Sequence, residues 1–184
     1  MPVFVALLRG VNVTGNNQIK MEVLRALCES LGHECVQTYI ASGNVVFRTK
    51  LRDPKRLARV LEDAIEQKLG FRPTVVMRTP DQLRETVAQN PFARRKQIEP
   101  SKLLVCFMLA APDAEALNKL SKLETAPEEL HVVGQEMYIY FLNGQGKSDL
   151  KLSKIDKILQ MPYTGRNWNT VNKLLEMADA LERG

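Results

Sequence analysis

The residues of this chain that could bind a ligand gather first in a polar loop near the N-terminus. The loop, Gly10–Asn17, has the G-x-x-x-x-G spacing of a phosphate-binding loop. Asn16 and Asn17 stand where such a loop carries a lysine, which reaches the terminal phosphates, and a hydroxyl residue, which holds magnesium. Hydrolysis of a nucleoside triphosphate is therefore not expected. The candidate ligand-binding residues in and beside the loop are Arg9, Asn12, Asn16 and Lys20.

The chemistry left to this loop is the binding of an anion. Backbone amides in such a loop, and the N-terminus of the helix that follows it, attract negative charge. The alternative is a loop that only joins a strand to a helix, since glycine and asparagine suit left-handed backbone angles.

A second polar cluster, Arg166-Asn167-Trp168-Asn169, lies at the start of the last predicted helix. The guanidinium fork of the arginine and the amides beside it suit a phosphate or a carboxylate. In the alternative interpretation, one of the two asparagines caps the helix and the tryptophan packs beside it. If this helix packs against the first half of the chain, Arg166 could complete a site near Arg9.

Other chemistry finds no support in the sequence. His33 and His131 each stand alone, without the neighbours that a catalytic triad needs. The cysteines are odd in number and lack metal-ligand spacing, so they are expected to be reduced and buried. They are Cys28, Cys35 and Cys106. No catalytic residue, metal site or cofactor is predicted, and the sequence leaves open whether the protein is an enzyme.

The spacing of apolar residues and of turn residues predicts the elements that must position these groups. In the first half they are a strand at Val3–Leu8, a helix at Ile19–Leu31, strands at Cys35–Ile40 and Asn44–Arg48, a helix at 54–69 and a strand at Pro73–Arg78. This βαββαβ order is that of a ferredoxin-like unit, in which the first two strands run parallel. The loop Gly10–Asn17 and the hairpin Ala41–Asn44 should therefore meet at one sheet edge, which adds Ser42 and Asn44 to the candidate ligand-binding residues.

The same order begins again about 100 residues later. A strand at Leu103–Leu109, a helix from Pro112, a hairpin around Gly134 and a helix at Ser148–Leu159 are followed by a weak strand at Tyr163–Asn167 and a final helix at Asn169–Leu181. We therefore predict an α+β fold of two ferredoxin-like halves related by duplication, plus a C-terminal helix. The expected bounds are 1–89 for the first half, 90–101 for a linker and 102–184 for the second half. A single α/β domain with irregular additions is the alternative.

The composition indicates the class of protein, its compartment and the charge of its partners. Hydrophobic residues make up 45% and charged residues 26% of the 184 residues, so a packed core is expected. No apolar run is long enough for a membrane span and no signal peptide is recognised, so we expect a cytoplasmic protein without membrane contact. The net charge of +5 favours acidic partners. The densest basic run, Arg94-Arg95-Lys96, is interpreted as a solvated loop, with a nucleic-acid patch as the alternative.

Four sequence blocks carry a resemblance to a known family. They are Leu8–Val13, Thr38–Phe47, Asn90-Pro91-Phe92 and Arg166–Thr170. In order and approximate spacing they are similar to the signature of the bacterial domain-of-unknown-function 1697 family. The resemblance implies an α+β fold of two related halves, and it implies no catalytic residue and no substrate.

Three function classes remain from the sequence. The leading hypothesis is the binding of a small anionic ligand, bearing a phosphate or a carboxylate, at the edge of the first half. The second is nucleic-acid binding, for which Phe4 and Phe47 on the first and third strands would have to stack on bases. The third is a protein-interaction module in which an exposed strand edge pairs with another copy to form a homo-oligomer. An enzyme acting on a phosphorylated or acyl substrate would lack an evident general base.

Overall fold

The computed structural model describes all 184 residues, which form two compact units. The first unit comprises Met1–Glu85 together with Asn172–Gly184, and the second comprises Thr86–Val171. Within the first unit, Arg84 forms ion pairs with Asp179, at 2.7 Å, and with Glu182 of this C-terminal stretch. The bounds predicted from the sequence, in contrast, include residues 172–184 in the second half.

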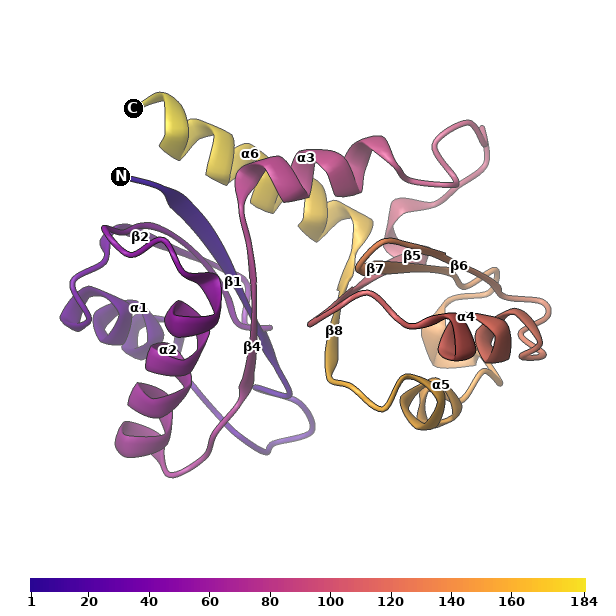
Figure 1. Cartoon of the computed structure of the whole chain (residues 1–184), viewed down its shortest axis with the longest axis horizontal. Coiled ribbons are helices and arrows are strands. Elements are labelled where there is room, and N and C mark those ends of the chain that lie inside the picture. The colour runs from indigo at the N-terminus through magenta and orange to yellow at the C-terminus, as the bar shows by residue number, and fades with distance from the viewer. The chain divides into compact units, whose positions relative to one another are not determined.

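The first unit is a four-stranded antiparallel sheet with two helices on one face (Figure 1). Its elements are β1 (Val3–Arg9), α1 (Met21–Ser30), β2 (Glu34–Tyr39), β3 (Asn44–Arg48), α2 (Pro54–Leu69), β4 (Thr74–Arg78) and the beginning of α3 (Pro80–Ala88). The strands are ordered β2-β3-β1-β4. The helices α1 and α2 pack on the sheet through a core that includes Phe4, Leu24 and Leu61.

The local sequence explains these elements. β1 is an uninterrupted apolar run because it lies between β3 and β4, with residues buried on both of its faces. α2 begins where the carboxylate of Asp53 accepts hydrogen bonds from the backbone amides of Lys55 and Arg56. It ends at Gly70, whose φ of +77° is the left-handed conformation that closes a helix.

The second unit repeats this plan with its own sheet and helices. Its elements are the end of α3, β5 (Leu103–Met108), α4 (Ala114–Ser121), β6 (Glu129–Val133), β7 (Glu136–Tyr140), α5 (Leu152–Leu159), β8 (Tyr163–Asn167), the beginning of α6 (Trp168–Arg183), and short 3-10 turns at Pro100–Lys102 and Gln145–Lys147. The strands are ordered β6-β7-β5-β8. The fold is therefore α+β, with two four-stranded antiparallel sheets and six α-helices that include a C-terminal one. None of the six has the length and hydropathy needed to span a bilayer.

The two sheets also share their register. In the first, Val5 of the central strand lies opposite Val46 of β3 and Arg78 of β4. In the second, Val105 lies opposite Tyr138 of β7 and Arg166 of β8. Both central strands end in the same way, because the Leu8 amide donates to the Gly43 carbonyl at 2.9 Å and the Met108 amide donates to the Gln135 carbonyl at 3.0 Å.

The segment expected to link the halves folds against the second unit. Phe92 is buried, and its ring lies 5.2 Å from that of His131 and 5.8 Å from that of Tyr140. Arg95 donates two hydrogen bonds, of 2.5 and 2.6 Å, to the carboxylate of Glu129, and this pairing lowers the pKa of that carboxyl. The basic run around Arg95 is thus partly neutralised within its own unit.

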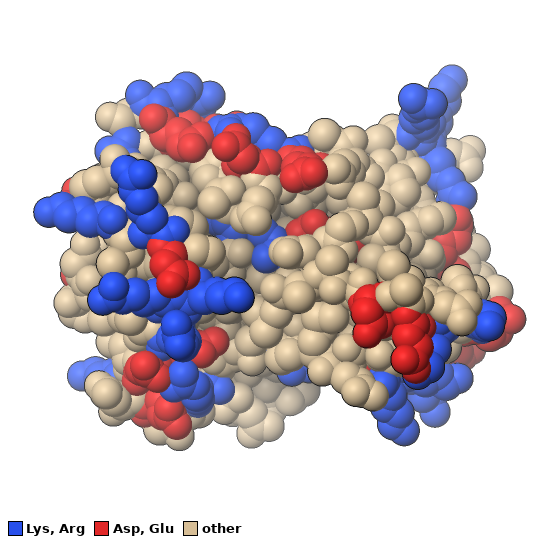
Figure 2. All heavy atoms as spheres, viewed as in Figure 1, with Lys and Arg blue, Asp and Glu red and all other residues tan.

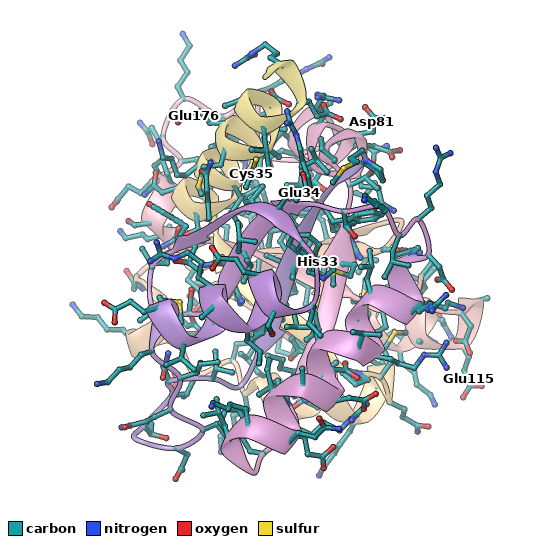
Figure 3. All side chains as sticks on the ribbon, turned by 90° about the vertical axis from the view of Figure 1, so that its left-hand side faces the viewer. His33, Glu34, Cys35, Asp81, Glu115 and Glu176 are labelled. Atoms are coloured by element: carbon teal, nitrogen blue, oxygen red, sulfur yellow. The ribbon has the colours of Figure 1, made fainter.

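The start of β2 combines a buried imidazole with an exposed thiol. Figure 3 labels His33, Glu34 and Cys35 in succession at this point. His33 is 5% exposed, stacks on Phe47 with 4.4 Å between ring centroids, and has no hydrogen-bond partner for Nδ1. Cys35 has a φ of +52° where the register with β3 shifts, and it is exposed. The prediction that the cysteines are buried is wrong for Cys35, because this irregularity places its side chain at the surface.

The buried His33 makes the stability of the protein depend on pH. Desolvation lowers its pKa below the ordinary 6.5, so between these two values the unfolded chain binds a proton that the folded chain does not. We expect the free energy of unfolding to fall as pH decreases below about 6.5, by at most about 1.4 kcal/mol per pH unit from this group. Urea unfolding at a series of pH values measures this slope. His33→Phe should flatten it, and an unchanged slope in that variant would contradict the assignment.

Candidate functional site

One asparagine side chain joins the Gly/Asn loop to the hairpin between β2 and β3. The Nδ2 group of Asn12 donates to the carbonyl of Ala41 at 2.7 Å and to the carbonyl of Ile19 at 2.9 Å. Its Oδ1 atom accepts a hydrogen bond from the Ile19 amide at 2.9 Å. The loop and the hairpin therefore lie side by side, as the topology predicted. Asn12 uses both ends of its amide on the backbone.

Gly43 brings the two segments into close contact. It has a φ of +79°, which favours glycine, and a Cβ atom at this position would lie 2.6 Å from Cγ2 of Val11 and 2.8 Å from Cβ of Leu8. No side chain fits there without displacing the loop or β1. The Val11 side chain can therefore pack directly on the hairpin.

The other polar candidates of this edge fall into two groups. Asn44 is buried and donates to the Tyr39 carbonyl at 2.9 Å and to Oγ of Ser42 at 3.0 Å, so this pair closes the hairpin. Arg9, Asn16 and Lys20 have exposed side chains. The structure thus brings the predicted residues to one edge but gives about half of them a structural role.

A surface pocket of about 460 Å³ opens beside this edge. It is lined by Asn12, Gln18, Ile19, Lys20, Val23 and Leu69. Lys20 is the N-cap residue of α1, and no side chain caps the helix at this end. The lining therefore includes one lysine, residues from the start of a helix, and the apolar residues Ile19, Val23 and Leu69.

Sequence reasoning missed part of this lining. Val23 and Leu69 belong to the apolar stripes of α1 and α2, which the sequence assigned to the core alone. The signal that could have found Gln18 is its place between the loop and Lys20. Leu69 lines the pocket because the end of α2 lies next to the start of α1. This proximity arises from the tertiary structure and cannot be read from the local sequence.

The second unit has a smaller pocket at the corresponding place, between the start of α4 and the end of α5. Its volume is about 130 Å³, and its lining is Asp113, Glu115, Ala116, Lys119 and residues 158–161. Here the helix start is capped from within, because Asp113 Oδ1 accepts a hydrogen bond from the Ala116 amide at 2.7 Å. Two carboxylates line this pocket, whereas none lines the pocket of the first unit.

The C-terminal cluster lies in the second unit. Arg166 is buried, and its Nη1 donates to Thr164 Oγ1 at 2.7 Å and to the Gly165 carbonyl at 2.8 Å. Desolvation lowers the pKa of its guanidinium to about 10. Asn167 caps α6 by accepting a hydrogen bond from the Thr170 amide at 2.9 Å, which is the capping role of the alternative interpretation.

The remaining residues of this cluster flank the start of α6. Trp168, the first residue of the helix, is half-buried, and Asn169 is exposed. Arg9 belongs to the first unit and Arg166 to the second, so a site shared by the two arginines stays a prediction.

Two further groups from the sequence have clear positions. Phe4 and Phe47 are 3% and 0% exposed in the core of the first unit, so neither ring can stack on a base.

Cys28 and Cys106 are buried, and desolvation raises the pKa of each thiol to about 12. No group of three or more His, Cys, Asp and Glu side chains is arranged to hold a metal ion.

The role of Asn12 can be separated from ligand binding by measuring stability. Asn12→Ala removes three hydrogen bonds to the backbone and should lower the free energy of unfolding by about 2–3 kcal/mol. Asn16→Ala is the matched control in the same loop, because that side chain is exposed, and we expect a change within about 0.5 kcal/mol. Equal effects of the two substitutions in chemical denaturation would contradict the role given to Asn12.

The close contact at Gly43 predicts a difference between two glycines with nearly the same backbone. Gly15→Ala, at a φ of +80° with open space around it, should cost only the strain of the left-handed conformation, about 1–2 kcal/mol. Gly43→Ala adds a clash with Val11 and Leu8 and should cost about 1–3 kcal/mol more. Thermal unfolding of both variants measures the difference. Equal losses would show that the contact is relieved without cost.

Comparison with known proteins places the chain in a family. No curated protein matches it. Among solved structures, it resembles the conserved bacterial protein SP0830 from Streptococcus pneumoniae, with 22% sequence identity and a TM-score of 0.75 over 97% of this chain and 99% of that one. At this identity the likeness concerns the fold. The family model described as protein of unknown function (DUF1697) matches residues 1–138, and the chain belongs to that family.

Proposed function

We propose that this protein binds a small molecule that carries an anionic group, a carboxylate or a phosphate, next to a short apolar part. The observation that supports this most is the pocket at the start of α1. Its lining includes Lys20 together with the apolar residues Ile19, Val23 and Leu69.

The anionic group has a place at the first turn of α1. The first amides of an α-helix have no acceptor inside the helix, and the helix dipole adds partial positive charge there. Lys20 and Val23, the N-cap residue and the third residue of the helix, both line the pocket. An anion in the pocket would meet backbone amides and the Lys20 ammonium group together.

The second unit supplies a model for this contact. At the start of α4 the acceptor is the carboxylate of the chain's own Asp113. At the start of α1 the N-cap residue is a lysine, whose side chain cannot accept a hydrogen bond. A carboxylate or phosphate of the ligand would take the place that Asp113 holds in the other unit.

The sequence candidates divide accordingly. Lys20 and the neighbouring Gln18 would contact the ligand, whereas Arg9 is exposed and is not part of the lining. Asn12, Ser42 and Asn44 would keep the shape of the loop and the hairpin. The cluster around Arg166 is not needed for this site.

We also propose that the two units arose by duplication of one ferredoxin-like unit. The shared strand order and the matching register around Val5 and Val105 support this origin. On this view the two helix-start pockets are related positions that have diverged, one to bind an external anion and the other to be capped by Asp113.

Thermal unfolding in the presence of candidate ligands tests the proposed function. The panel comprises inorganic phosphate, short-chain carboxylates of two to eight carbons, and phosphate monoesters with apolar groups. A ligand present at about 100 times its dissociation constant should stabilise the protein by about 2.7 kcal/mol. We expect the stabilisation by carboxylates to increase with the length of their apolar chain and then to stop increasing. A panel without any response would contradict the proposal.

A substitution at the N-cap of α1 should have two opposite effects. Lys20→Asp supplies the missing acceptor and should raise the free energy of unfolding by about 1 kcal/mol, while it removes the stabilisation by ligand. The matched control is Lys151→Asp, since Lys151 is also an N-cap residue without a side-chain cap, at the start of α5. That variant should gain similar stability and keep the full response to ligand. A full response in Lys20→Asp would contradict the placement of the anion.

A further inference from the structure

The positive charge of the protein is concentrated in ten residues at the start of α2. The segment Lys50–Arg59 holds five basic residues and one acidic residue. The basic residues, which we call the α2 cationic surface, are Lys50, Arg52, Lys55, Arg56 and Arg59. The whole chain has 26 basic and 21 acidic residues, so the rest of it is almost neutral.

The cationic surface is exposed and is not neutralised by the protein itself. All five side chains are exposed, and none of them takes part in an ion pair. The one carboxylate of the segment, Asp53, is engaged in capping the helix. Figure 2 shows Lys and Arg side chains gathered on the side of the first unit where α1 and α2 lie.

The acidic residues of α2 lie further along the helix and are held by another cation. Arg72 pairs with Glu62 at 3.2 Å and with Glu66 at 2.9 Å, and it also contacts Asp63. These three carboxylates are therefore not available to compensate Lys55, Arg56 and Arg59. The charge of α2 is separated along its axis, with free cations at the start and paired anions towards the end.

This arrangement opposes the ordinary preference of a helix. The N-terminal turn favours acidic side chains, and α2 has none in its first turn. Cations that work against local helix stability are accounted for if they serve an external polyanion. We propose that the α2 cationic surface binds the phosphate backbone of double-stranded nucleic acid without regard to base sequence.

The surroundings of this surface favour a duplex over the other polyanions. The large apolar side chains that the protein exposes are Met1, Val13, Ile40, Leu109, Leu117 and Leu142, and none belongs to the surface, so it offers nothing to insert into a lipid bilayer. It contains no aromatic residue on which the bases of a single strand could stack. Three of its five cations are arginines, whose planar fork matches a phosphate.

Fluorescence anisotropy with labelled 20-base-pair DNA and RNA duplexes tests this proposal. We expect both duplexes to bind at low salt, and the logarithm of the affinity to fall linearly with the logarithm of the salt concentration. The slope should be about 0.9 for each phosphate contacted on DNA, hence about 3–4 for three or four contacts. Single strands of the same length should bind more weakly. Absence of duplex binding at 50 mM salt overturns the proposal.

Charge reversal at three positions tests the location. The variant Lys55→Glu, Arg56→Glu, Arg59→Glu should bind duplex at least tenfold more weakly, with a shallower salt dependence. It should remain folded, because acidic residues suit the first turns of a helix. The matched control reverses the exposed Lys122, Lys151 and Lys154 of the second unit and changes the net charge equally. An equal loss in the control overturns the proposal, as does tighter binding to vesicles of anionic lipid than to duplex.

Discussion

The geometry of the candidate site depends on the three hydrogen bonds of one side-chain amide. Asn12 links the two ends of its own loop at Ile19 and then reaches the hairpin at Ala41, which is 29 residues further along the chain. Its positive φ of 55° points the side chain into this arrangement, and asparagine tolerates that conformation better than most residues do. This link adds to the apolar contacts of Val11, Ile19 and Leu24, which hold the loop and the start of α1 on the core of the first unit.

The same backbone plan gives different chemistry in the two units. Both units have a helix start opposite a helix end, and both have a pocket there. What differs is the N-cap residue: the Asp113 carboxylate accepts a hydrogen bond from the Ala116 amide in one unit, and Lys20 provides no side-chain cap in the other. On the function proposed above, the residue type at this one position would decide whether a helix start is capped from within or is available to a ligand. The scaffold itself does not dictate which of the two occurs.

The sequence predicted the elements well where local signals define them. The apolar run of β1, the cap at Asp53 and the terminating Gly70 are all readable within a few residues, and they set the correct strands and helices. β8 was weak because Thr164, Gly165 and Arg166 carry no apolar pattern, and its pairing with β5 makes it a strand. The resemblance to the family rests on short sequence blocks, and the match of the family model to residues 1–138 agrees with that resemblance.

The candidate site was harder to predict because its parts come together only in the folded chain. An asparagine in a loop can bind a ligand or the backbone, and the partner that decides for Asn12 is the distant Ala41. The apolar wall needs Leu69, about fifty positions from Lys20. The exposed thiol of Cys35 follows from an irregularity of register that no sequence pattern announces. The cationic surface was also missed, because Lys50, Arg52, Lys55, Arg56 and Arg59 are spaced along the sequence, whereas Arg94-Arg95-Lys96 forms an uninterrupted run.

The discontinuity of the first unit affects how the protein is made. The second unit is one continuous stretch, Thr86–Val171, whereas the first needs Asn172–Gly184 to be complete. During synthesis, which adds about 5–20 residues per second, the N-terminal sheet leaves the ribosome before Asn172–Gly184, which carry the last part of α6. The unit that begins first is therefore finished last. A chain shortened before Asp179 would leave Arg84 with Asp81 as an ion-pair partner but without Asp179 and Glu182.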